Sequence, residues 1–266
     1  MYNQFNAVRP NVPPVPAAKS PSFDTARWLI AAALGLSILY VLFWPQIFDY
    51  LRESSTNMEE IGPKCVAIAN VRAYLSTALW IAAYFSMAYV CRPLMTFAII
   101  MTAGEILNII LNQYVFGWLG LNFYAEIFWL QIPSRLLFTL GYAFLWAQTP
   151  EARKPFINLA CIYMVTCIWS TISLGPFLSM PGGEESFQIS KEINDQLSSY
   201  DSPFVYAVMW IIMIVCWWKY LGAVKPDEVS TTTIGEVLNQ RFFYAFIIVY
   251  AVGVGLAYIL GKSIML

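Results

Sequence analysis

Four ionisable side chains lie inside long apolar stretches of this sequence: Arg72, Glu105, Glu126 and Arg135. An ionisable group at the centre of a membrane helix costs about 2.5 kcal/mol or more unless it is paired or hydrated, so each of these is a functional candidate. Glu105 and Arg135 fall near the middle of neighbouring stretches, and we expect them to pair in the interior. Arg72 and Glu126 lie nearer the ends of their stretches, where they can pair with each other or extend toward water.

Amide side chains share the faces of these charges. Glu105, Asn108 and Asn112 recur at i, i+3 and i+7, which places them on one face of a helix. Gln131 and Arg135 are four residues apart and share a face of the next helix. We call the whole set the intramembrane polar seam: Arg72, Glu105, Asn108, Asn112, Glu126, Gln131 and Arg135. Such a seam can hold helices together by cancelling charges, carry a proton, ion or small polar solute, or contact lipid headgroups.

The residue types present exclude much catalytic chemistry. The chain has no histidine, the commonest neutral metal ligand and the side chain that titrates near neutral pH without perturbation. Its five cysteines form no C-x-x-C pair, and the glycine motifs that bind nucleotides are missing. We therefore expect no catalytic residue, and no metal or other cofactor bound by this chain's own side chains.

The composition is that of a polytopic membrane protein. Apolar residues make up 59% of the chain and charged residues 12%, and the mean hydropathy is +0.60. A soluble surface needs more charge than this. The net charge is -1, and Lys and Arg are spread thinly, whereas a nucleic-acid partner requires a clustered basic face. The expected partners are membrane lipids and other membrane subunits, with no nucleic acid.

Apolar stretches of about 20 residues match the length of a helix that crosses a bilayer. The sequence has seven of them, at 27–48, 65–91, 94–116, 122–148, 155–178, 203–222 and 241–261. They predict an all-α fold, a bundle of about seven transmembrane helices over residues 27–266. Residues 1–26 contain five prolines, which disfavour helix and predict an extended tail.

Two connections carry signals of their own. Thr233 and Glu236 have the spacing of a capping box, which predicts a short helix before the last span. Residues 188–198 place apolar side chains four apart, a pattern that suits a helix lying on the membrane surface or on a partner.

The loops predict an orientation. Basic residues are more frequent in the connections on the N-terminal side of the bundle, which favours a cytoplasmic N-terminus and an outside C-terminus. The basic residues on that side are Arg9, Lys19, Arg27, Arg92, Arg153, Lys154, Lys219, Lys225 and Arg241, against Arg52, Lys64, Lys191 and Lys262 on the other. We expect a bacterial-type inner membrane, with an organelle membrane as the alternative.

Part of the chain resembles a known family. The run GEILN at 104–108, followed by GW at 117–118 and NF at 122–123, resembles the G-E-x-x-N, G-W and N-F run of the smaller membrane subunit (the A subunit) of particulate methane and ammonia monooxygenases. Pro133-Ser134 and Trp217-Trp218 occur in a similar order. The resemblance covers residues 90–222.

The resemblance departs from the family at two points. The spacings between its short motifs differ by a couple of residues, and the stretch at 241–261 is additional. The resemblance implies a subunit of a copper-dependent monooxygenase whose copper lies largely on partner subunits. No copper ligand of the family carries over to this chain, and Glu105 and Asn108 transfer only as buried polar positions.

The leading expectation is a non-redox integral subunit of a larger membrane complex, of the particulate monooxygenase type and not catalytic on its own. The alternative is a stand-alone transporter or channel for a small polar solute or ion, which would use the polar seam. A scaffold for assembly is the third class.

Overall fold

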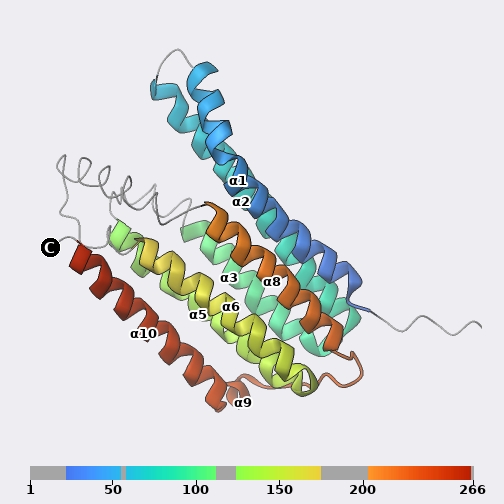
Figure 1. The fold of residues 1–266 in the computed structure, drawn as a ribbon. Coiled ribbons are helices and arrows are strands. Elements are labelled where there is room, and N and C mark those ends of the chain that lie inside the picture. The colour runs from blue at the N-terminus through green and yellow to red at the C-terminus, as the bar shows by residue number, and fades with distance from the viewer. Residues whose placement is uncertain (1–21, 55–57, 112–123, 175–202, 265–266) are drawn as a thin grey trace, which may run out of the picture.

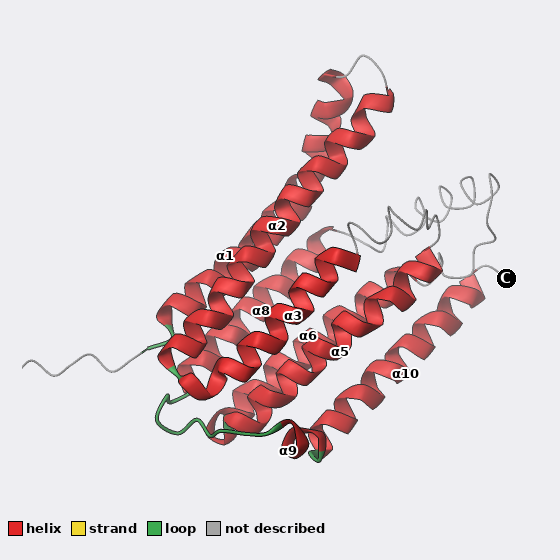
Figure 2. Ribbon diagram, turned by 180° about the vertical axis from the view of Figure 1, so that it is seen from behind, coloured by secondary structure: helices red, strands yellow, loops and turns green. Residues whose placement is uncertain are grey.

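The described part of the chain is mostly helical. The computed structural model describes residues 22–54, 58–111, 124–174 and 203–264, and their regular elements are all helices (Figures 1 and 2). The predicted all-α class is confirmed.

Each predicted apolar stretch contains one long helix. The long helices are α1 (Asp24–Ser54), α2 (Met58–Val90), α3 (Met95–Ile109), α5 (Tyr124–Gln148), α6 (Arg153–Leu174), α8 (Pro203–Ala223) and α10 (Arg241–Ile264). Short 3-10 turns, η1 (Arg92–Leu94) and η3 (Pro150–Ala152), join α2 to α3 and α5 to α6, each with a proline at its start.

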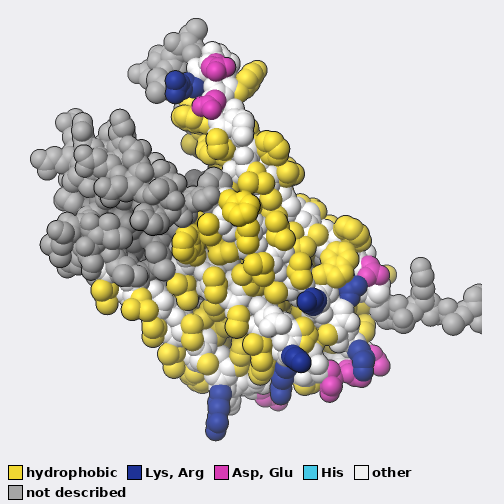
Figure 3. Space-filling view, in the orientation of Figure 1, with side chains coloured by type: hydrophobic (Ala, Val, Ile, Leu, Met, Phe, Trp, Pro, Cys, Tyr) yellow, Lys and Arg dark blue, Asp and Glu magenta, His cyan; other side chains and the backbone are white. Residues whose placement is uncertain are grey.

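Among the described residues, three helices are both long and apolar enough to cross a membrane. They are α1, the Pro63–Val90 part of α2, and the Phe204–Ala223 part of α8. Apolar side chains cover the middle of the molecule in Figure 3, whereas charged side chains gather at its lower end and at the tip of α1 and α2. The helices therefore indicate a membrane protein, and the full count of seven spans stays a prediction.

The first helix begins earlier than the sequence suggested. Helix α1 starts at Asp24, three residues before the predicted span. The last three residues of the predicted tail, residues 1–26, therefore belong to this helix. The Asp24 carboxylate accepts a hydrogen bond from Ser22 at 2.8 Å and pairs with Arg27 at 2.8 Å. A carboxylate in the first turn also stabilises the helix dipole. Residues 1–21 lie outside the described part.

Six helices form a closed ring. Helix α1 packs against α2 and α8, α2 against α3, α3 against α5, α5 against α6, and α6 against α8. Helix α10 packs outside the ring, against α5 and α6. We call the end where α1 begins and α2 ends the base. Away from the base, α1 and α2 project beyond the other described helices (Figures 1 and 2).

The connection from α8 to α10 crosses the base. The Ser230 amide donates to the Gln148 carbonyl at 3.0 Å, and the Cys91 thiol donates to the Pro226 carbonyl at 3.4 Å. The predicted capping box is confirmed at the start of α9 (Ile234–Leu238), where the Thr233 and Glu236 side chains each bond the other's backbone N–H. The predicted stripe at 188–198 lies outside the described residues.

Helices α3 and α5 approach closely at two glycines. A methyl group on Gly104 would lie 2.9 Å from the Phe138 ring, and one on Gly141 would collide with the Met101 side chain. Because Glu105 follows Gly104 directly, this close packing fixes the height at which its carboxylate enters the bundle.

Candidate functional site: a polar cavity inside the helix ring

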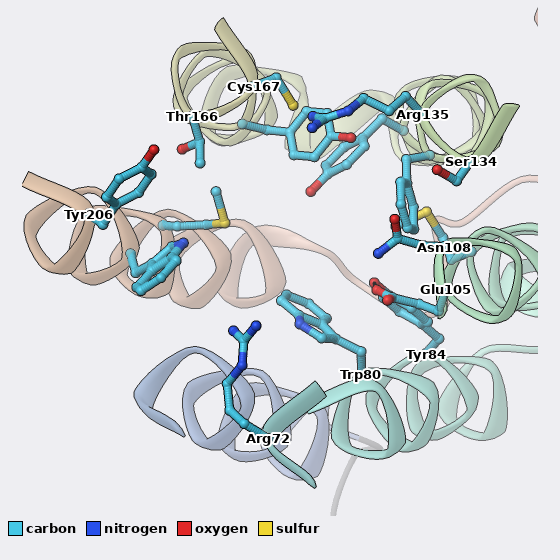
Figure 4. A pocket seen from close by; sticks show the side chains of 16 residues that line it. Arg72, Trp80, Tyr84, Glu105, Asn108, Ser134, Arg135, Thr166, Cys167 and Tyr206 are labelled. Carbon is cyan, nitrogen blue, oxygen red and sulfur yellow. Dashed lines mark hydrogen bonds between the residues drawn. The ribbon is translucent and has the colours of Figure 1, made fainter. Parts of the chain in front are cut away.

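A cavity of about 480 Å³ lies inside the ring, between α2, α3, α5, α6 and α8. Charged and polar side chains share its wall with aromatic ones (Figure 4). The charged and amide residues are Arg72, Glu105, Asn108 and Arg135. An adjoining cavity of about 370 Å³ between α2 and α3 shares Arg72, Trp80, Glu105 and Asn108 with it.

The cavity brings together part of the predicted polar seam. Arg72 comes from α2, Glu105 and Asn108 from α3, and Arg135 from α5. The other three seam residues cannot be placed in the same way. Asn112 lies outside the described residues, and so do the side chains of Glu126 and Gln131, although their backbone belongs to α5.

Glu105 interacts with a tyrosine rather than with an arginine. The Tyr84 hydroxyl on α2 donates a hydrogen bond to Glu105 Oε1 at 3.3 Å. The ion pairs among the described side chains are Arg27 with Asp24 and Lys225 with Glu228. The expected ion pair of Glu105 with Arg135 is therefore wrong.

Arg135 lines the cavity on the wall formed by α5 and α6, and its side chain extends from α5 toward α6 (Figure 4). The groups near its guanidinium include Cys167 and Tyr163 on α6 and Tyr250 on α10. These groups thus belong to α6 and α10, whereas Glu105 lies on α3. The order of α3 and α5 along the sequence does not determine how α5 is rotated about its own axis.

Arg72 reaches the cavity from the opposite wall. Its guanidinium lies 4.8 Å from the centre of the Tyr40 ring on α1, a cation–π contact that supports it from behind. Its Nε is buried without a hydrogen bond partner. In Figure 4 the guanidinium points into the space between the helices. The expected pairing of Arg72 with Glu126 involves a side chain outside the described part.

Aromatic residues make up most of the remaining wall. They are Trp80, Tyr84, Phe138, Tyr142, Tyr163, Tyr206 and Trp210. Trp80 stacks on Tyr84 with 5.6 Å between ring centres, and Tyr142 contacts Tyr163 at 4.5 Å.

Sequence reasoning missed this wall, although a signal was present. Arg72, Ser76, Trp80 and Tyr84 recur every four residues, so the aromatic rings lie on the same face of α2 as the charge. Tyr206 and Trp210 have the same spacing on α8. Aromatic residues are also common on faces that contact lipid. The spacing therefore indicates a cavity wall only because an arginine lies on the same face.

Tightly packed rings separate the cavity from the base. Phe97, Trp217 and Tyr220 are at most 1% exposed, and Tyr84 and Tyr142 pack beside them. Below this layer, Thr149 and Tyr220 share a hydrogen bond of 3.0 Å between their hydroxyl groups. The cavity therefore has an apolar floor on the base side.

The chemistry available in the cavity is that of binding. Positive and negative groups, an amide and several aromatic faces converge there, which suits recognition of a small polar molecule. In the part of the chain that the structure describes, no three Cys, Asp or Glu side chains gather as metal ligands do. The expectation that this chain binds no cofactor stays a prediction.

Comparison with known proteins assigns the chain to no family. No protein-family model, curated protein or solved structure matches the chain. The functional argument therefore rests on the cavity and its residues.

Proposed function

We propose that this protein binds a small polar solute in the cavity and carries it across the membrane. The observation that supports this function is that Arg72 and Glu105 line the same cavity without pairing with each other. The sequence offered such a transporter as the alternative to a complex subunit.

The arrangement of charges argues against a purely structural role. A charge placed inside a membrane protein to hold helices together is stabilised when its partner is close, and an unpaired buried charge is costly. Arg72 has an aromatic ring as its partner and Glu105 has a hydroxyl. Both groups retain capacity for further hydrogen bonds, which water or a solute in the cavity can supply.

The position of the cavity along the helices fits a binding site at membrane depth. At about 1.5 Å per residue, Glu105 lies roughly 15 Å from the base end of α3, and Arg72 roughly 27 Å from the base end of α2. A hydrocarbon core of about 30 Å would contain both residues. We place the base on the cytoplasmic side, where Arg92, Lys154 and Lys225 are exposed, with all seven long helices as spans.

Flux into proteoliposomes tests this function. Vesicles containing the full chain are exposed to gradients of glycine, sodium acetate, choline chloride or glycerol, and light scattering follows their swelling. At least one solute is expected to enter faster than into empty vesicles, and Arg72→Gln should abolish the difference. Ile99→Ala, which removes an exposed apolar side chain from α3, is the matched control. Equal rates with and without protein for all four solutes would contradict the proposal.

The α1 and α2 pair favours a second candidate, a non-redox subunit of a larger membrane complex. These helices have 31 and 33 residues, which at about 1.5 Å each gives lengths of roughly 46 and 50 Å. A hydrocarbon core of about 30 Å leaves a long projecting segment. At its tip, Phe48 and Tyr50 are exposed beside polar residues. Any copper would then lie on partner subunits.

Native mass spectrometry of the gently solubilised protein tests the second candidate. Subunits that remain bound would support it, and their loss after deletion of residues 2–22 would assign the tail a part in assembly. A monomer or homo-oligomer under the same conditions would contradict it.

A further inference from the structure

Two opposite charges line one cavity on adjacent helices, yet they do not meet. Arg72 and Glu105 both line the main cavity and the adjoining one, and helices α2 and α3 pack directly against each other. They form no ion pair within 4.0 Å. In Figure 4 the Trp80 indole lies between the Arg72 guanidinium and the Glu105 carboxylate.

The surrounding contacts hold each charge in place. Tyr40 supports the Arg72 guanidinium from α1, and Tyr84 binds Glu105. Tyr84 is itself fixed between Trp80, at 5.6 Å between ring centres, and Phe97, at 5.5 Å. The two charges are therefore kept apart by packed rings.

The helix positions indicate how far apart the charges lie along the bundle axis. Arg72 and Glu105 lie roughly 27 and 15 Å from the base ends of their helices at about 1.5 Å per residue, so their Cα atoms differ in height by roughly 12 Å. The long arginine side chain can shorten that gap. A molecule that reaches both charges must still carry its own charges several bonds apart.

We propose that the solute of this cavity is a zwitterion whose anionic group binds Arg72, whose cationic group binds Glu105, and whose apolar linker packs on Trp80. The proposal rests on the proposed function and names the class of its solute. A singly charged solute would pair with one of these two charges and leave the other unpaired. The Trp80 face adds cation–π attraction for an ammonium group.

Arg135 does not change this assignment. It lines the cavity on the wall formed by α5 and α6, where Cys167, Tyr163 and Tyr250 lie near its guanidinium. Trp80 lies beside Arg72 and away from Arg135 (Figure 4).

Calorimetric titration of the full chain in nanodiscs tests the proposal. The probes are glycine, 4-aminobutyrate and 6-aminohexanoate, with hexanoate and hexylammonium as singly charged matches of the longest probe. We expect affinity to increase along the amino-acid series. We also expect 6-aminohexanoate to bind about tenfold or more tightly than either singly charged match, because the zwitterion forms one charge pair more than either match does.

Two variants assign the ends of the solute. Arg72→Gln should remove the preference for 6-aminohexanoate over hexylammonium, and Glu105→Gln should remove the preference over hexanoate. Arg72→Lys keeps the charge and should keep most of the binding, which separates loss of a contact from loss of fold.

The outcomes separate this proposal from the function on which it rests. Equal binding of hexanoate or hexylammonium and the zwitterion would overturn the zwitterion assignment but keep a solute-binding cavity. Failure of every probe to bind, in nanodiscs where the protein keeps its helical circular dichroism, would overturn the zwitterion assignment, and equal flux of all four solutes with and without protein would overturn the proposed function as well. Competition by phosphatidylethanolamine, measured against nanodiscs of phosphatidylglycerol alone, would identify the zwitterion as a lipid headgroup. Absence of competition alongside probe binding would identify it as a soluble molecule.

Discussion

Tyr84 on α2 binds Glu105 on α3 through a hydrogen bond of 3.3 Å from its hydroxyl to the carboxylate. Tyr84 is only 2% exposed, so its hydroxyl group has little access to other partners. The bond joins two helices of the ring and fixes one wall of the cavity. A tyrosine thereby takes the place that the sequence suggested for Arg135.

Tyr84→Phe should lower the free energy of unfolding by about 0.5 to 1.5 kcal/mol, the range for a typical hydrogen bond, because 3.3 Å is long for a hydroxyl donor. Tyr89→Phe is the matched control, because Tyr89 lies on the same helix and is 90% exposed. Denaturant unfolding in detergent measures both. If the two variants lose the same stability, the bond to Glu105 has no energetic role.

The buried hydroxyl pair near the base predicts an asymmetry. Thr149 Oγ1 donates to the Leu145 carbonyl at 2.6 Å, so Tyr220 is the donor in its 3.0 Å bond with Thr149. Tyr220→Phe removes that donor and should cost about 0.5 to 1.5 kcal/mol. Thr149→Val instead leaves a fully buried tyrosine hydroxyl without an acceptor and should cost about 1 to 3 kcal/mol. The reverse order in thermal unfolding would contradict this assignment of the donor.

Two glycines of α10 should respond in opposite directions to the same substitution. A methyl group on Gly253 would lie 2.6 Å from Ile168 on α6, whereas Gly255 has open space around it. Gly253→Ala should destabilise the protein by about 1 to 3 kcal/mol through overpacking. Gly255→Ala should stabilise it by about 0.5 to 1 kcal/mol through the lower flexibility of the unfolded chain. Melting temperatures of both variants, and rescue of Gly253→Ala by Ile168→Val, check the contact.

The sequence predicted the helices well because an apolar stretch long enough to cross a membrane has few alternatives to helix. It also singled out Arg72, Glu105, Asn108 and Arg135, since ionisable and amide groups are rare in such stretches. It did not predict which of them meet. That depends on the rotation of each helix and on which helices become neighbours, as for Arg135, which turns to Cys167 on α6.

The aromatic wall escaped prediction for a related reason. Rings such as Trp80 and Tyr206 are compatible with lipid, with a packed core and with a binding cavity. Only the closure of the ring, in which α8 packs against both α1 and α6, places them opposite one another.

The reactivity of a cysteine at Asn108 tests most directly whether the cavity is a polar, solute-accessible site. Asn108 lines both cavities, whereas Ile106 on the same helix is 47% exposed on the apolar surface. Each position is changed to cysteine in a chain whose five natural cysteines are replaced by alanine. The proteins in liposomes are then treated with a small, charged methanethiosulfonate reagent, which reacts with the hydrated thiolate. We predict rapid modification of Asn108→Cys, slowed by bound 6-aminohexanoate, and no modification of Ile106→Cys. An Asn108→Cys protein that stays unmodified, or that reacts no faster than Ile106→Cys, would contradict the account.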